Sequence, residues 1–226
     1  MKRIPTFDGP FPTRLYFTDD EIEEICSAAL IETGLLPTKP EQIRIDRLID
    51  KKFRAPIIYE DLGESVLGFT EFGPNGVEAV HIGEPPGDLI VQEERRVNST
   101  LAHEAGHGLM HAQLFIEHFA NHTPIESHPD VTETRILCRE QKANVVSKQK
   151  RYKGDWWEFQ ANRAIGALLM PKELLPMFLE PFHSKFGTTK LSELPAKSKR
   201  EIIEAASNIF DVNQMVARVR LNLPYV

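Results

Sequence analysis

The stretch LAHEAGHGLMH at residues 101–111 places a glutamate between two histidines that are four residues apart. On a helix, residues i and i+4 lie about 5–6 Å apart on one face, so His103 and His107 can direct their imidazoles at one metal ion. Glu104 is offset by one position, toward a water molecule at the open position of the metal, where it can act as general base. The segment therefore predicts a metal hydrolase, although the same pattern also arises by chance on amphipathic helices.

A catalytic zinc ion normally has three protein ligands, so a third ligand must be sought elsewhere. His111 continues the row of histidines, but it lies one further turn along the helix, about 6 Å by helical rise, which is too far for the same ion. Glu158, in WWEFQANRAIGALLMP, is the better candidate because a carboxylate on a second helix completes a set that many zinc peptidases use. Asn162, four residues further on, could hydrogen-bond to one of the ligands.

Two alternatives to this ligand set remain open. Glu158 stands three residues after Asp155, the spacing of a capping box, which would give it a purely structural role at a helix start. A second metal site is also conceivable between the two motifs, although the spacings there fit no short chelating pair. Its candidate ligands are His118, His122, His128 and Cys138.

The elements that must position these residues run in the order helix, strand, helix. Residues 18–34 and 40–53 have caps and apolar spacings typical of helices, and three short β-branched segments follow within residues 56–83. Asn98 or Ser99 could cap the histidine helix. Further on, the basic residues 131–154 and the segment ending at Pro171 are expected to be helical, residues 181–199 are expected to form a linker, and residues 200–223 are expected to form two short helices.

This order predicts an α+β fold in which a small antiparallel sheet packs on the histidine helix and a helical C-terminal subdomain follows. The expected division is a main domain at residues 1–171, with an insert at about 112–154, and a helix-turn-helix-like subdomain at residues 172–226. The basic half of the insert could meet an acidic partner or nucleic acid, but such charge runs are more often solvated surfaces.

The composition limits the class of protein. The chain has 226 residues and a net charge of -6, which argues against a surface that binds nucleic acid as a whole. Its apolar runs are too short for a membrane span or a signal peptide, so no membrane partner is expected. Two cysteines are a poor basis for a disulfide framework and suit a reducing compartment, which predicts a cytoplasmic location.

Three stretches together resemble the ImmA/IrrE family of zinc-dependent proteases over roughly residues 40–171: RVNSTLAHEAGH, the E-x-x-A-N and LLMP elements of the Glu158 segment, and IDRLIDKKFRAPIIYEDLGESVLGFTEF. The resemblance implies a zincin-like core, with His103, His107 and Glu158 as zinc ligands and Glu104 as catalytic base. Its best-understood members cleave a helix-turn-helix repressor. The stretch between His107 and Glu158 is longer here than that pattern leads one to expect.

The expected function is that of a zinc-dependent endopeptidase with one Zn²⁺ ion, acting on a specific protein such as a helix-turn-helix transcriptional repressor. Another divalent metal would also suit the ligand set. One alternative is a metal-binding scaffold or sensor without catalysis. The other is a DNA-binding regulator in which Arg218 and Arg220 of the C-terminal helices, or the basic insert, contact nucleic acid, although the few basic residues give this reading little support.

Overall fold

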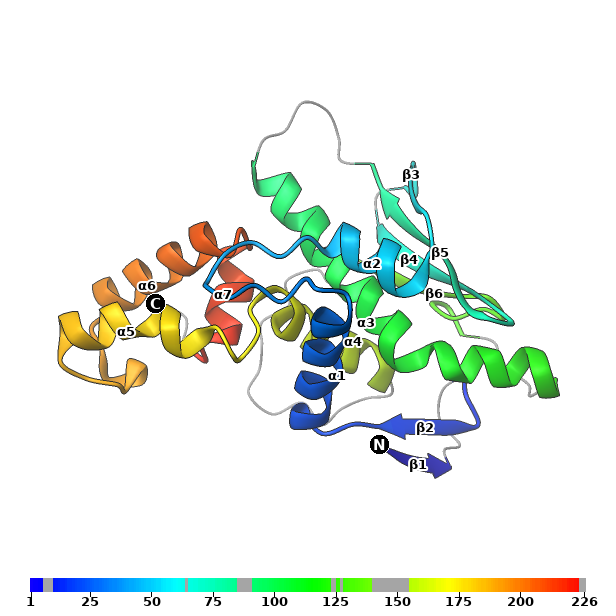
Figure 1. Ribbon diagram of the computed structural model, residues 1–226. Helices are drawn as coiled ribbons and strands as arrows, with labels where there is room; N and C mark the ends of the chain where they lie inside the picture. Colours follow the sequence, from blue (N-terminus) through cyan, green and yellow to red (C-terminus); the bar gives the residue numbers. More distant parts are fainter. Residues whose placement is uncertain are drawn as a thin grey trace.

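The computed structural model describes residues 1–5, 10–63, 65–84, 91–122, 125–126, 128–139 and 155–223. The expected α+β class is confirmed. A long helix, α3 (Val91–Asn121), runs through the middle of the molecule, with a sheet on one side and shorter helices on the other (Figure 1). The described part of the chain contains no helix that is long and apolar enough to cross a membrane.

The main sheet has four strands in the order β3-β5-β4-β6, and it packs on α3 through β4 and β5. β4 runs antiparallel to both of its neighbours, but β3 is parallel to β5, so the expectation of a purely antiparallel sheet is wrong. The tight turn after Gly73 pairs β4 with β5 as a hairpin, which leaves β3 to add to the far side of β5 in the parallel direction. The strands are β3 (Ile57–Glu60), β4 (Val66–Gly73), β5 (Gly76–Gly83) and β6 (Arg135–Arg139).

Strand β6 corrects the expectation of a helix over residues 131–154. Arg135–Arg139 pairs antiparallel with β4, and Ile136 and Cys138 are buried while their neighbour Leu137 is only partly so. Burial that alternates from one residue to the next is typical of a strand. The backbone groups of this segment are satisfied by pairing with the open edge of β4. The rest of the expected helix, residues 140–154, lies outside the described residues.

The N-terminal half also departs from expectation in two places. A hairpin of β1 (Lys2–Pro5) and β2 (Thr13–Tyr16) forms where an irregular start was expected. Helix α3 begins at Val91, so Asn98 and Ser99 do not cap it. Ser99 instead donates its hydroxyl to the carbonyl of Arg95, 2.8 Å away, inside the helix.

The remaining helices close the other side of α3. The helix start expected near Thr18 is confirmed, because Thr18 and Glu21 form a capping box there. Residues 181–186 belong to α5 and residues 196–199 belong to α6, so the linker expected over residues 181–199 is wrong at both ends. The helices are α1 (Asp19–Glu32), α2 (Ile45–Phe53), α4 (Trp156–Leu169), α5 (Leu175–Phe186), η1 (Leu191–Glu193), α6 (Ala196–Ile209) and α7 (Gln214–Arg220).

One hydrophobic cluster joins buried residues of all seven α-helices, from Ile22 to Leu223. Arg220 of α7 adds a polar link, because its Nε atom donates to the carbonyl of Met170 at 2.8 Å and its Nη2 atom lies 2.8 Å from a carboxylate oxygen of Glu23. The C-terminal helices are therefore packed on α1 and α4, and the division at residue 171 stays a prediction.

Candidate metal centre

The close approach of α3 and α4 brings the two sequence motifs together. Gly106 marks the contact: a Cβ atom at this position would lie 2.7 Å from the Cβ of Ala164 and 3.2 Å from the Cα of Ala161. Real Cβ atoms do not come so close, so only glycine allows this helix separation. The histidines of α3 consequently face the first turn of α4, which carries Glu158.

Ligand atoms of three residues converge in this interface. The Nε2 atoms of His103 and His107 are 3.0 Å apart, and the carboxylate oxygens of Glu158 lie 3.2 Å from the first and 3.1 Å from the second. Ligand atoms at 2.0–2.1 Å from a tetrahedral zinc ion are separated by roughly 3.4 Å. The described residues include this group among those that could hold a metal ion, and both histidines are buried.

The hydrogen-bonding state of Glu158 also fits a metal ligand better than a helix cap. Asp155 makes no side-chain hydrogen bond at the start of α4, so the capping-box alternative is wrong. The Oε1 atom of Glu158 is buried and lies 3.1 Å from Nε2 of His107, an atom that carries a lone pair when Nδ1 of that imidazole holds the proton. A buried carboxylate oxygen without a donor is costly, and a cation would satisfy it.

A chain of hydrogen bonds determines which ring nitrogen of His107 carries the lone pair that can bind a metal ion. The carbonyl of Leu15 can only accept, so the Nε2 amide group of Gln160, 2.7 Å away, donates to it. The Oε1 atom of Gln160 then accepts from Nε2 of His111 at 2.9 Å, and Nδ1 of His111 accepts from Nδ1 of His107 at 2.9 Å. Nε2 of His107 is left with a lone pair that points at the ligand group.

Asn162 holds the other imidazole in place. Its Oδ1 atom lies 3.2 Å from Nδ1 of His103, so a proton on Nδ1 is donated to the amide and Nε2 faces Glu158. The structure thus brings together the four residues expected at a ligand site, namely His103, His107, Glu158 and Asn162. It adds His111 and Gln160 as residues that orient His107.

Glu104 lies beside the ligands, fully buried, and Thr70 of β4 holds one of its oxygens. The Thr70 hydroxyl donates to Oε2 of Glu104 at 2.7 Å, whereas Oε1 has no hydrogen-bond partner among the described residues. Burial raises the pKa of Glu104 to about 8. Oε1 is consequently the oxygen that can take up a proton from a reacting group.

The pKa shifts of the cluster follow from burial and from pairing. Burial disfavours a charge on Glu158, but the imidazoles of His107 and His103 outweigh it and hold the pKa of Glu158 well below its usual range. Burial lowers the pKa of His111 to about 3, which keeps this imidazole neutral. Burial likewise lowers the pKa of His107. Burial also disfavours a charge on His103, but the neighbouring Cys138 and Glu158 outweigh it and raise the pKa of His103 well above its usual value. A metal ion requires neutral imidazoles, so its binding would displace the proton that His103 holds in the metal-free protein.

The second metal site considered from the sequence does not form as a separate cluster. Among the described residues, the only other group with metal-ligand spacing contains Cys138, with His103 and Glu104, and their ligand atoms lie within 4.8 Å of one another. His118, His122 and His128 belong to neither group. The two groups share His103, so Cys138 lies beside the first centre.

Sequence reasoning missed Thr70 and Gln160, and it left His111 without a role. Thr70 is distant in sequence and carries no local signal, because only the packing of β4 on α3 brings it to Glu104. His111 had a usable signal: residues four apart on a helix are neighbours, so a histidine after His107 can hydrogen-bond to it.

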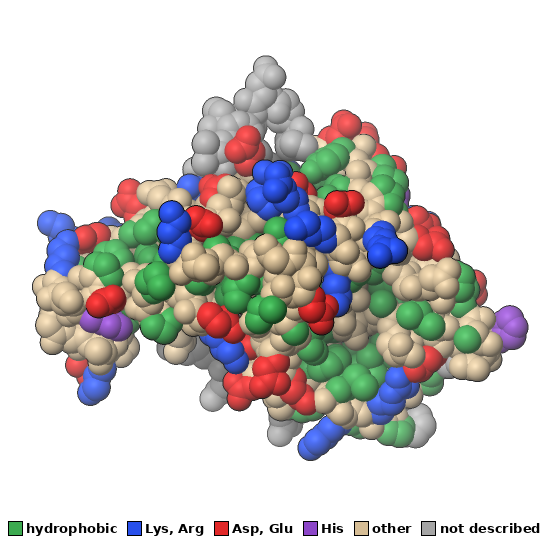
Figure 2. Space-filling model, in the orientation of Figure 1, with side chains coloured by type: hydrophobic (Ala, Val, Ile, Leu, Met, Phe, Trp, Pro, Cys, Tyr) green, Lys and Arg blue, Asp and Glu red, His purple; other side chains and the backbone are tan. Residues whose placement is uncertain are grey.

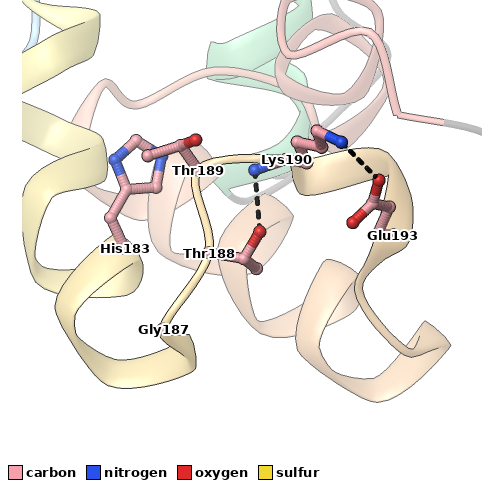
Figure 3. Close-up of a pocket in the computed structure, with 6 residues that line it drawn as sticks. All are labelled: His183, Gly187, Thr188, Thr189, Lys190 and Glu193. Atoms are coloured by element: carbon pink, nitrogen blue, oxygen red, sulfur yellow. Dashed lines mark hydrogen bonds and ion pairs between the residues drawn. The ribbon is translucent and has the colours of Figure 1, made fainter.

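A separate hollow of about 440 Å³ lies at the C-terminal end of α5, away from the α3–α4 contact. Figure 3 shows that Lys190 pairs with Glu193 in this hollow while its backbone N–H donates to Thr188. The lining residues are His183, Gly187, Thr188, Thr189, Lys190 and Glu193. It holds no residue of the metal centre.

Comparison with known proteins adds no name to this geometry. No family model matches the chain, and no curated protein matches it. The function must therefore be argued from the buried cluster of His103, His107 and Glu158, which could hold a metal ion.

Proposed function

We propose that this chain is a zinc-dependent endopeptidase in which His103, His107 and Glu158 bind the metal and Glu104 is the general base. The proposal depends on the convergence of ligand atoms from three residues, with contacts of 3.0–3.2 Å, beside the Glu104 carboxylate on the histidine helix. Two nitrogens and one carboxylate suit zinc, although another divalent ion would compete for the same ligands. The resemblance to the ImmA/IrrE proteases supports the same residue roles and a zincin-like arrangement of α3 and the sheet.

The residues around the centre have different roles in the proposed reaction. A zinc ion held there would lower the pKa of a bound water to about 7 and polarise the scissile carbonyl. Oε1 of Glu104 takes the proton of the attacking water and delivers it to the leaving amine. Thr70 keeps Oε2 of the same carboxylate occupied, so the proton is received at one defined atom. The buried surroundings strengthen each of these contacts.

The substrate class in this proposal rests on the resemblance. It implies a specific protein, such as a helix-turn-helix transcriptional repressor, and regulated cleavage at one site instead of general digestion. Direct DNA binding by the C-terminal helices has less support, because the guanidinium of Arg220 is engaged by Glu23 and Met170. Figure 2 also shows acidic and basic side chains interspersed on the face in view, whereas a DNA-binding face gathers basic ones.

The proposal predicts that Glu104 is needed for cleavage but not for metal binding. Zinc-loaded wild-type protein and the Glu104→Gln variant would each be incubated with a cell lysate, and new protein N-termini would be identified by mass spectrometry. We expect a small set of new N-termini with the wild type and none of these with Glu104→Gln. Identical N-termini in both samples would contradict the proposal.

A further inference from the structure

Cys138 is the one residue of the β6 strand that reaches the metal centre. It is opposite Gly68 in the pairing of β6 with β4. A Cβ atom at Gly68 would lie 3.0 Å from Cγ2 of Thr100, so this face of the sheet points at α3. Only 7% of Cys138 is exposed, and its thiol belongs to one group with His103 and Glu104.

The second observation is the unpartnered carboxylate oxygen of Glu104. Oε1 is completely buried and has no hydrogen-bond partner among the described residues, and the ligand atoms of Glu104, His103 and Cys138 lie within 4.8 Å of one another. In a zinc peptidase, the attacking water lies between the metal and the general base. The thiol of Cys138 lies beside His103 and Glu104, on the side of the centre where the general base would meet this water.

We propose that Cys138 acts as a fourth metal ligand in competition with water, so that the closed form of the centre lowers the peptidase activity without abolishing it. This inference rests on the proposed metal centre of His103, His107 and Glu158. Four protein ligands are typical of closed, structural zinc sites, whereas catalytic sites keep one position for water. On coordination the thiol loses its proton to solvent and a bond forms between Sγ and the metal in place of a water molecule. Release reverses both changes and consumes no oxidant.

The position of Cys138 in the fold allows such a release. β6 is an edge strand whose ladder with β4 is antiparallel and already shifts register between Val66 and Gly68, opposite the Cys138 end. β6 and the preceding segment, which is bridged to it through Val131 and Ile136, can detach from β4 together while β3, β5 and β4 stay paired. The metal ligands on α3 and α4 do not depend on this strand, so displacement of β6 would open the water position and leave the metal bound.

The test replaces the native metal of the full chain with Co²⁺ and records its absorption spectrum. A thiolate ligand gives an intense near-ultraviolet charge-transfer band, whereas nitrogen and oxygen ligands give only the weaker visible bands of the ion. We expect both features in the wild type and loss of the charge-transfer band alone in Cys138→Ser and Cys138→Ala. Cys26→Ser, which changes the buried thiol of α1, is the matched control and keeps both features.

The outcomes separate the two proposals. Visible bands without a charge-transfer band in the wild type would overturn the role of Cys138 and leave the metal centre standing. Absence of all bands at excess Co²⁺ would overturn the metal centre and, with it, this inference. Because the visible bands report on the intact centre, they also show that the Cys138 variants have folded. Acetohydroxamate should perturb the visible bands of Cys138→Ala more strongly than those of the wild type, and equal perturbation would count against closure.

Discussion

Histidines and glutamates come together both in the metal centre and in the hollow beside α5, with different results. Between α3 and α4 they are buried, come from two helices, and meet with their ligand atoms 3.0–3.2 Å apart. In the hollow beside α5 they lie on one short stretch of chain, and the pair between Lys190 and Glu193 is 70% and 61% exposed. The comparison teaches that residue type alone does not make a site, since burial and convergence decide what the groups can bind.

The energetic reason is the surroundings of each group. In a low-dielectric interior, an unpaired polar atom is expensive and a paired one interacts strongly. In water, an ion pair is worth little because solvent screens it. Changes in the metal centre should therefore have large effects, and matched changes in the hollow should have small ones.

The largest effect is expected for Gly106→Val at the helix contact. The new side chain would overlap Ala164 and Ala161, so we expect a loss of about 3 kcal/mol in the free energy of unfolding together with loss of metal binding. Gly187 in the hollow has open space around it, and Gly187→Ala should cost only about 1 kcal/mol because its φ is +68°. Urea denaturation measures both. Equal losses would show that the α3–α4 contact is not tightly packed.

Replacement of His111 tests whether the hydrogen-bond chain orients His107. His111→Ala leaves Nδ1 of His107 without its acceptor, so metal affinity should fall about 10- to 100-fold. His183→Ala in the hollow should leave the affinity unchanged. Competition with a chelator of known affinity gives both values. If the His111→Ala variant binds the metal with wild-type affinity, His111 does not orient His107 for metal binding.

The metal-free protein should lose stability as the pH rises. The pKa of Glu104 is about 8 in the folded state and near 4.5 when unfolded, so the folded state holds more protons between these values. Below about pH 6.5 the lowered pKa values of His111 and His107 act in the opposite sense, because the unfolded state then binds more protons at these histidines. The free energy of unfolding should therefore fall between about pH 6.5 and 8, by up to about 1.4 kcal/mol per pH unit. Glu104→Gln should flatten the decline, and Glu193→Gln in the hollow should keep it. If the free energy of unfolding falls as steeply in Glu104→Gln as in the wild type, another group causes the decline.

The smallest effect is expected for Lys190→Ala. The Lys190–Glu193 pair has a nitrogen–oxygen distance of 3.1 Å, but both side chains are mostly exposed. Its removal should change the free energy of unfolding by about 0.5 kcal/mol or less. Thermal denaturation at low and high salt is a sufficient check. A loss comparable to that of Gly106→Val would contradict the contrast between the two places.

The part of the site that could be predicted from sequence is the part governed by helical periodicity. His103, His107 and Glu104 follow from spacing within one helix, and Asn162 follows from its place four residues after Glu158. Glu158 itself had two readings, because a capping box and a ligand need the same spacing. Only the packing of α4 against α3 decided against the cap.

The parts that sequence could not supply depend on contacts between distant segments. Thr70 and Cys138 come from neighbouring strands that meet α3 only in the folded sheet. The five residues Arg135–Arg139 are too few to show a clear period of two, and the charged residues around them favoured the prediction of a helix. They form a strand because they pair with the edge strand β4. The early start of α3 was missed because Asn98 and Ser99 resemble caps in the sequence.

The central claim is that His103, His107 and Glu158 hold one metal ion beside a base that is not a ligand. The most direct test is the metal content of purified wild type, Glu158→Gln and Glu104→Gln, measured by inductively coupled plasma mass spectrometry. The account predicts about one zinc ion per chain in the wild type and in Glu104→Gln, and loss of zinc in Glu158→Gln. A wild type that stays free of metal after zinc loading, or a Glu158→Gln variant that keeps its zinc, would contradict it.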